Sequence, residues 1–190
     1  MPLKVALLGQ PVLREIATDV APEEIATPEF QAFLQEMAET MVANSGVGLA
    51  APQVFASRRV FLARIIPTQD PDELPGIEVF INPRLTPVSE ERVSGWEGCL
   101  SFMELNVLVP RQRRVIVEYL DAAGAPKTLE LSDFPARVVQ HENDHLDGIL
   151  TIDRAATTRD IVKASEMETV IEMRKKRAAE MEAITIDDAQ

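Results

Sequence analysis

The chain has two histidines and one cysteine, and the spacing of the histidines suggests that all three serve one metal site. Both histidines lie in residues 141–145, His-Glu-Asn-Asp-His, an H-E-x-x-H pattern, and the cysteine is Cys99. On a helix, residues four positions apart share a face, so His141 and His145 can reach one cation. A thiolate from elsewhere would complete a three-ligand site with an open position, which is how catalytic metal ions are held. These residues therefore predict a catalytic metal centre.

Glu142 has a different task from the two histidines. It directly follows the first ligand and lies next to the open position, where a carboxylate can take a proton from water and pass it to a leaving amine. Asp144 and Asp147 are expected to be solvated or to orient a ligand imidazole. The alternative is a helix with two ordinary histidines. Chance matches occur in about one chain of this length in a few hundred, so we favour the metal site.

The third ligand has two sources in the sequence. Many H-E-x-x-H sites take it from further downstream, and this chain has no later histidine; its glutamates at 166–172 lie in a charge-mixed segment typical of a helix surface. A lone cysteine is often an inert buried hydrophobe. The neighbours Gly95, Trp96 and Gly98, however, predict a tight, irregular segment that approaches a ligand closely. We therefore expect Cys99 to bind the metal as a thiolate.

A third segment, Gly46–Gln53, contains a G-x-G pattern followed by small residues. It lacks the third glycine of a dinucleotide site and the Gly-Lys-Ser/Thr of a phosphate loop. Small residues would let the backbone approach a ligand, and the Gln53 amide is of the kind that stabilises the oxyanion of a tetrahedral intermediate. By itself the segment is also compatible with an ordinary turn at the end of a helix.

Composition limits the class of protein. A length of 190 residues and a hydrophobic fraction of 46% predict one domain with a sizeable core. No apolar run reaches the roughly 18 residues of a membrane helix and no signal region begins the chain, so we expect a soluble, cytoplasmic protein without membrane partners. The single cysteine fits a reducing compartment. A net charge of −12 argues against charge-driven binding to DNA.

The first half of the chain predicts one helix and two strands. Thr27-Pro28 is typical of a helix start, and apolar residues follow at helical spacing. These core-facing residues are Phe30, Phe33, Leu34, Met37 and Met41. The β-branched runs Val60–Ile66 and Ile77–Ile81 predict strands separated by a turn-rich stretch, 67–76, and Asn82-Pro83 is expected to end the second strand.

The second half predicts a hairpin and two helices. Arg113–Tyr119 and Lys127–Leu131 are expected to pair as strands. Asp133 is expected to cap the helix that carries both histidines, and Asp147-Gly148 to end it. A long last helix, over about residues 159–183, has an apolar stripe that predicts packing on the body.

Short connections between the strands favour antiparallel pairing. We therefore expect an α+β fold, with short, mainly antiparallel strands around a central metal-binding helix and a long C-terminal helix.

Three segments in this order resemble the motifs of the peptide deformylase family. The pattern G-x-G-L-A-A-x-Q matches Gly46–Gln53, E-G-C-L-S matches Glu97–Ser101, and Q-H-E-x-D-H-L-x-G matches Gln140–Gly148. The joint pattern is highly specific. It implies a catalytic domain over residues 1–155, with residues 156–190 as a helical extension packed on it or trailing from it.

The resemblance implies a reaction and a metal. Members of the family remove the formyl group from the N-terminal formylmethionine of newly made polypeptides. Cys99, His141 and His145 would bind the ion, physiologically Fe²⁺ and replaceable by Ni²⁺, Co²⁺ or Zn²⁺. Glu142 would act as general base and acid while hydroxide on the metal attacks the formyl group.

The resemblance also assigns the residues around the substrate. Gln53 and the backbone N–H of Leu100 would stabilise the oxyanion. The nascent N-formylmethionyl peptide would run past Gly48, Glu97 and Gly98. Val47 and Val138 match positions near the methionine pocket.

Two alternatives differ from this function. Phe102-Met103-Glu104 replaces the aliphatic residue and proline that many members have after the cysteine motif, which allows the alternative of a related metallo-amidase acting on another N-acylated substrate. The other is a non-catalytic, metal-containing protein that docks on the ribosome through the basic residues 174–177 of the C-terminal helix. Structural metal sites are usually closed by four protein ligands, which disfavours it. A basic cluster of this kind is most often a solvated helix face.

Overall fold

The computed structural model describes residues 2–66 and 76–187, with side chains described as far as residue 177. The helices are α1 (Pro22–Ile25), α2 (Pro28–Ala43), α3 (Asp133–Leu146) and α4 (Met167–Asp187). The strands are β1 (Gly48–Ala50), β2 (Val60–Ile66), β3 (Gly76–Pro87), β4 (Arg92–Gly98), β5 (Leu105–Gln112), β6 (Arg114–Leu120), β7 (Pro126–Ser132) and β8 (Ile161–Lys163). The short 3-10 helices are η1 (Pro11–Arg14), η2 (Ala51–Val54), η3 (Leu100–Phe102), η4 (Thr151–Arg154), η5 (Thr158–Asp160) and η6 (Ala164–Glu166).

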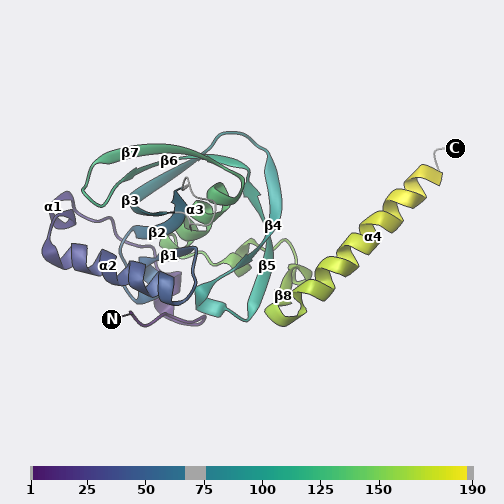
Figure 1. Cartoon of the computed structure of the whole chain (residues 1–190), viewed down its shortest axis with the longest axis horizontal. Coiled ribbons are helices and arrows are strands. Elements are labelled where there is room, and N and C mark those ends of the chain that lie inside the picture. The colour runs from purple at the N-terminus through teal and green to yellow at the C-terminus, as the bar shows by residue number, and fades with distance from the viewer. Residues whose placement is uncertain (1, 67–75, 188–190) are drawn as a thin grey trace.

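The strands form two antiparallel sheets that surround α3 (Figure 1). One sheet has the order β1-β2-β3-β6-β7 and the other the order β4-β5-β8. Every pairing between these strands is antiparallel. The structure therefore confirms the predicted α+β class, with the histidine-bearing helix at the centre.

Strand β2 of the five-stranded sheet is buried on both faces, because α2 covers one face and α3 the other. Along β2, Val60 and Leu62 pack in the cluster that contains α2, while Phe61 and Ala63 pack in the cluster that contains α3. The period-two alternation of a strand sends neighbouring side chains to opposite faces. α2 confirms its predicted start, since the Thr27 hydroxyl accepts a hydrogen bond from the Phe30 N–H at 3.3 Å.

The start of α3 differs from the prediction, although its end does not. Asp133 does not cap the helix; it is the first helical residue, with φ of 54°, and Ser132 takes the N-cap position without a side-chain bond. The Asp133 carboxylate is instead occupied by Arg113 Nε at 3.0 Å. Gly148, with φ of 69°, follows the C-cap Asp147 as predicted.

Two strand predictions were wrong. Asn82-Pro83 does not end β3, because Asn82 adopts φ of 51° and the register shifts between Ile81 and Arg84 while the strand continues to Pro87. The Asn82 side chain bonds both backbone groups of Val20, which stabilises this bulge. Residues 95–98 are not irregular either; they lie in β4, in unbroken register with β5.

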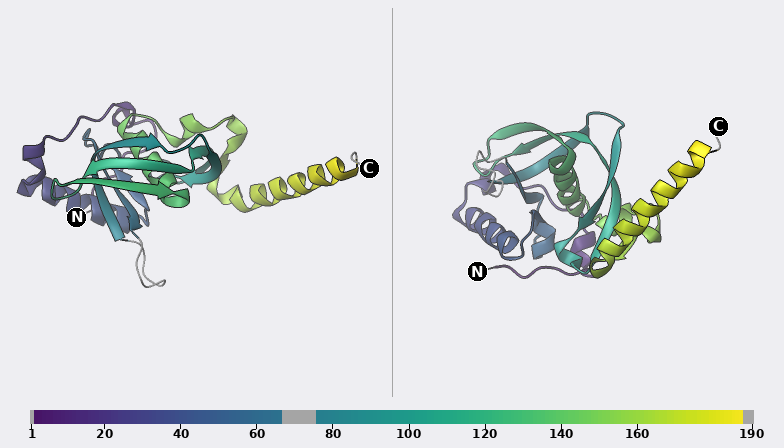
Figure 2. Two further views of the ribbon diagram at one scale, coloured as in Figure 1. Left: turned by 90° about the horizontal axis from the view of Figure 1, so that it is seen from above. Right: turned by 45° about the vertical axis from the view of Figure 1, so that its right-hand side comes forward.

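The C-terminal helix begins later than predicted and does not pack along the body. Ile161–Lys163 pairs with β5 as β8, so α4 begins only at Met167. Figures 1 and 2 show α4 extending away from the rest of the protein. Its described contact with the body lies near its start, where the Arg174 guanidinium lies 5.1 Å from the Trp96 ring centroid and pairs with Asp160.

Two further expectations from the sequence concern membrane-spanning helices and the turn-rich stretch 67–76. Within the described residues, no helix combines the length and the hydropathy that a membrane crossing requires. The predicted turn-rich stretch, apart from Gly76, lies outside the described residues.

Candidate active site

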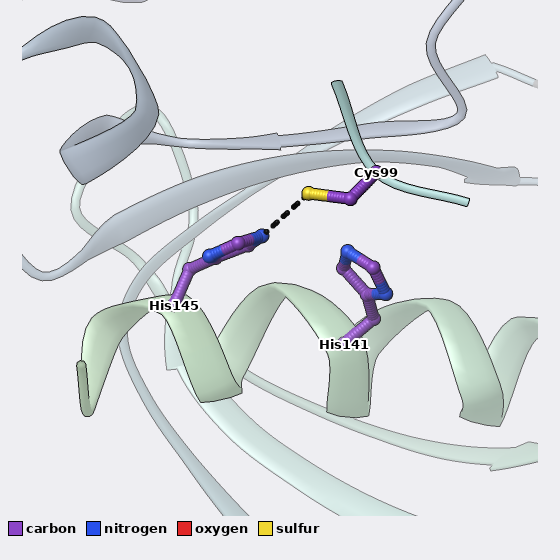
Figure 3. Close-up of side chains that lie close together, drawn as sticks. All are labelled: Cys99, His141 and His145. Atoms are coloured by element: carbon purple, nitrogen blue, oxygen red, sulfur yellow. Dashed lines mark hydrogen bonds between the residues drawn. The ribbon is translucent and has the colours of Figure 1, made fainter. Parts of the chain in front are cut away.

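The three predicted ligands converge on one point (Figure 3). His141 and His145 project from the same face of α3 toward Cys99, which lies between β4 and η3. Their ligand atoms all lie within 4.8 Å of one another, and Cys99 Sγ is 3.3 Å from His145 Nε2. All three residues are buried. The spacing of the two histidines predicted that they share a helix face, and the fold brings Cys99 next to that face.

The donor set fits a transition-metal ion. Two imidazole nitrogens and one thiolate sulfur are typical ligands of Zn²⁺ and of related divalent ions. Cys99 and His141 also line a cavity of about 350 Å³, together with Glu142. Three protein ligands beside a cavity leave room for water or substrate, which is the arrangement of a catalytic site.

Glu97 orients the first histidine. Its Oε2 lies 2.9 Å from His141 Nδ1, so the other ring nitrogen is left for the metal. Arg111 bonds both Glu97 oxygens at 3.0 Å, and Arg137 Nη1 donates to Oε1 at 2.7 Å. Burial raises the pKa of Glu97, but the hydrogen bonds from His141 and Arg111 outweigh it and lower the pKa to about 2. The carboxylate is therefore ionised and holds His141 firmly.

Neither aspartate near the helix end has this role. Asp144 is buried and pairs with Arg111 and Arg154, while Asp147 pairs with Arg59. The resemblance had placed Glu97 only along the substrate path. The sequence signal that could have revealed its partner was weak, because the contact depends on β4 and α3 meeting in the fold.

We expect Glu97→Gln to weaken metal binding by 10–100-fold, as loss of a carboxylate that orients a ligand imidazole typically does. A metal titration of the apoprotein would measure the affinity. Glu91→Gln is the matched control, since Glu91 pairs with Arg113 on the surface. Equal affinities for wild type and Glu97→Gln would show that His141 does not need this carboxylate.

Glu142 is buried beside the three ligands, in surroundings that suit a general base. It is 4% exposed, and its Oε2 has no hydrogen-bond partner among the described residues. Burial raises the pKa of Glu142 to about 7. A carboxylate with a pKa near the working pH can both accept and return a proton. Because the group lines the cavity beside the ligands, it faces the place where water would react.

Gly48 is fitted to Glu142 so closely that a side chain would collide with it. A Cβ built on Gly48 would lie 2.3 Å from Glu142 Oε1. We expect Gly48→Ala to displace the carboxylate and to lower kcat roughly a hundredfold, since misplacement by about 1 Å has effects of this size. The test is a double-mutant cycle with Glu142→Ala, which removes the colliding Cγ, Cδ and Oε1 atoms, so that Gly48→Ala should cost little further activity in that background. Additive losses in the double mutant would contradict the proposed contact.

The predicted oxyanion donors lie on the cysteine side of the site. The Gln53 Oε1 accepts from the Ala50 N–H at 2.9 Å, which turns the amide nitrogen toward Ser101 Oγ at 3.2 Å and Cys99 Sγ at 3.5 Å. Leu100 is the first residue of η3, where backbone N–H groups lack an intrahelical partner. The Gln53 amide is therefore directed at Cys99, and the Leu100 N–H directly follows Cys99 in the chain.

The remaining predicted residues line the same cavity. Gly48 begins β1, at the edge of the five-stranded sheet, and Val47 directly precedes it. Glu97 and Gly98 end β4, at the edge of the three-stranded sheet. Val138 lines the cavity from α3. Two strand edges thus border the cleft, and an edge carries backbone groups free to pair with an added extended peptide.

The fold and the site together define a metal-dependent hydrolase. The family model described as Polypeptide deformylase matches residues 2–160. The chain belongs to the polypeptide deformylase family.

Similar proteins share most of the length of this chain. Peptide deformylase 2 of Nostoc sp. is 38% identical over 171 residues, which cover 89% of this chain and 94% of that protein. A Met-Ala-Ser-bound class I type b peptide deformylase from Acinetobacter baumannii matches with a TM-score of 0.75 and 37% identity, over 81% of this chain and 98% of that one. The peptide deformylase of Thermotoga maritima gives a TM-score of 0.73 and 37% identity, over 83% and 99%.

Proposed function

We propose that this chain removes the formyl group from N-formylmethionyl peptides by hydrolysis. The observation that carries the proposal is the convergence of Cys99, His141 and His145 beside the buried Glu142, whose Oε2 has no hydrogen-bond partner within the described part of the chain. The family membership independently favours the same reaction. A non-catalytic role would give Glu142 and Gln53 no reason to lie at the metal site together.

The bound metal would supply Lewis acidity, which polarises a carbonyl and acidifies water. We infer that Cys99, His141 and His145 hold it, and that it is Fe²⁺ in the cell, with Ni²⁺, Co²⁺ or Zn²⁺ as substitutes. Soft thiolate ligation is compatible with each of these ions. The Glu97 carboxylate keeps the His141 ring oriented for binding.

Glu142 and the oxyanion donors carry out the steps assigned to the chain itself. Glu142 accepts a proton from water as the formyl carbon is attacked, and then delivers it to the departing amine of methionine. The Gln53 amide and the Leu100 N–H stabilise the negative charge that develops on the formyl oxygen. Burial of Glu142 supports both transfers, because its pKa of about 7 lies near neutrality.

The peptide is proposed to lie as an extended strand between β1 and β4. Gly48, Glu97 and Gly98 offer backbone groups along this path, and Val47 and Val138 provide apolar contacts for the first side chain. A Met-Ala-Ser peptide is bound in the Acinetobacter baumannii relative. That precedent supports a short N-terminal peptide as the ligand of this cleft.

The reaction can be tested with formyl-Met-Ala-Ser in ¹⁸O-labelled water. Hydrolysis should release formate that carries one solvent oxygen, together with an equal amount of free Met-Ala-Ser. Transfer of the formyl group to another acceptor would release no labelled formate. That result, or no cleavage by metal-loaded protein, would overturn the proposal.

We further propose that α4 docks on the ribosome and that the protein therefore acts in the cytoplasm. The globular part, residues 1–155, would then be the catalytic domain. The side chains of 174–177 are exposed, and α4, which carries them, extends away from the body (Figure 1). Such a basic cluster is complementary to RNA phosphates.

Replacing Lys175, Lys176 and Arg177 with alanine should weaken ribosome binding and reduce its salt dependence, while turnover of a short peptide stays unchanged. Ribosome co-sedimentation at several salt concentrations would measure this. Binding equal to that of wild type would remove the docking proposal.

A further inference from the structure

Two neighbouring cavities of the structure share lining residues, one of which is an arginine. The larger, about 350 Å³, contains the metal ligands, and a smaller one of about 190 Å³ lies beyond it. Phe134 and Arg137 line both cavities. The side chains of these two residues therefore form the partition between the catalytic cleft and the second space.

The partition lies at the end of the cleft that is furthest from His145 along α3. Phe134, Arg137, Val138 and His141 recur at helical spacing, so they share the face of α3 that lines the cleft. Arg137 is four residues before His141, a distance of about 6 Å along the helix axis. A side chain that enters past Val138 would meet Arg137 next.

Arg137 is fixed in place by acceptors on the far side. Its Nη1 donates to Glu97 Oε1 at 2.7 Å and to the Val109 carbonyl at 2.8 Å, and its Nη2 donates to the Val93 carbonyl. A Cβ on Gly95 would lie 2.8 Å from the guanidinium carbon, so the missing side chain at Gly95 makes room for it. The charge of Arg137 is compensated by Glu97, and the residue acts as a rigid wall.

We propose that Arg137 is a specificity-determining residue, the end wall that sets how long a substrate's first side chain can be. This inference rests on the proposed deformylase function. The ligand class is an unbranched, apolar side chain of about methionine length, and the wall excludes longer ones from the second cavity. Truncation of Arg137 would remove its part of the partition and open a passage beside Phe134.

The test compares formyl-norleucyl-Ala-Ser with formyl-2-aminooctanoyl-Ala-Ser, whose side chain is two methylenes longer. Wild type should prefer the shorter substrate in kcat/KM. Arg137→Ala should shift the ratio of the two kcat/KM values toward the longer substrate by roughly tenfold or more. Arg137→Met occupies similar space without the hydrogen bonds and should keep the wild-type ratio. Arg113→Ala, which lines only the second cavity, is the matched control.

These variants distinguish the steric effect of the Arg137 side chain from the effect of losing its contact with Glu97. Both Arg137 variants lose that contact, so an effect through Glu97 lowers turnover of both substrates equally and leaves the ratio unchanged. An unchanged ratio in folded, metal-loaded Arg137→Ala would overturn the proposal, as would an equal shift in Arg137→Met. If wild type cleaves neither formyl peptide nor formyl-Met-Ala-Ser, the proposed function itself fails.

Gly95→Ala tests the same wall if Arg137→Ala does not fold. The added methyl group would displace the guanidinium away from Gly95 and toward the cleft, because Gly95 lines the second cavity and not the cleft. The ratio should then move further toward the shorter substrate. A shift toward the longer substrate, or none, would overturn the proposal.

Discussion

Glu142→Gln should lower kcat by about 10²–10⁴-fold, which is the typical contribution of a positioned general acid and base. The amide keeps the shape of the side chain but cannot accept and return the proton. Because Glu142 is assigned no place in the ligand set, the metal content should stay equal to that of wild type. Stopped assays with formyl-Met-Ala-Ser, together with metal analysis of the same samples, would measure both quantities.

An exposed glutamate serves as the control for this substitution. Glu166→Gln changes the same functional group far from the cavity lining and should leave kcat unchanged. If Glu142→Gln retained wild-type kcat, another group would have to move the proton. If it lost the metal instead, Glu142 would have to be reassigned as a ligand.

Removal of the metal should abolish turnover, and restoring one equivalent per chain should recover it. Without the ion the site loses its Lewis acid, and the Gln53 amide and the Leu100 N–H alone do not acidify the attacking water. Metal binding should also stabilise the fold, by about 4 kcal/mol when free metal is a thousandfold above its Kd. Activity and thermal unfolding of chelated, reloaded and untreated protein would test both expectations.

Cys99 provides an internal check on metal removal, because it is the only cysteine. A thiol reagent should modify Cys99 in the chelated protein more rapidly than in the loaded protein, and Cys99→Ser should lose the thiolate-to-metal absorption of a Co²⁺-substituted sample. Equal modification rates with and without metal would show that the thiolate is not a ligand.

The local pattern of the sequence predicted what depends on neighbouring residues. The spacing within residues 141–145 predicted that both histidines share one helical face, and in the structure both are buried on α3. The strand predicted over Arg113–Tyr119 is β6, which pairs with β7 and buries the alternating Val115, Val117 and Tyr119. Both are periodicities that a strand or helix imposes on its own residues.

The errors arose where distant segments override local preference. The helical pattern after Thr157 suggested one continuous helix, but β5 offers backbone groups to Ile161–Lys163, and these residues pair as β8. Asp133 has a side chain suited to capping, but Arg113 occupies it. Tertiary contacts decided both cases.

The same limit applies to the surroundings of the metal. The ligands, Glu142 and Gln53 could be predicted because their motifs carry the chemistry. The contact of Glu97 with His141 depends on how β4 meets α3, as does the placement of Arg137 against Gly95. No residue spacing in the sequence predicts these two contacts between distant segments.

The most direct test of the central claim is the turnover of formyl-Met-Ala-Ser beside acetyl-Met-Ala-Ser by protein loaded anaerobically with one Fe²⁺ or Ni²⁺ per chain. The proposed site predicts rapid release of formate, little cleavage of the acetyl peptide, and loss of formate release when the metal is chelated. Absence of formate release from fully loaded protein, or equal cleavage of the two peptides, would contradict the assignment of this site as a deformylase centre.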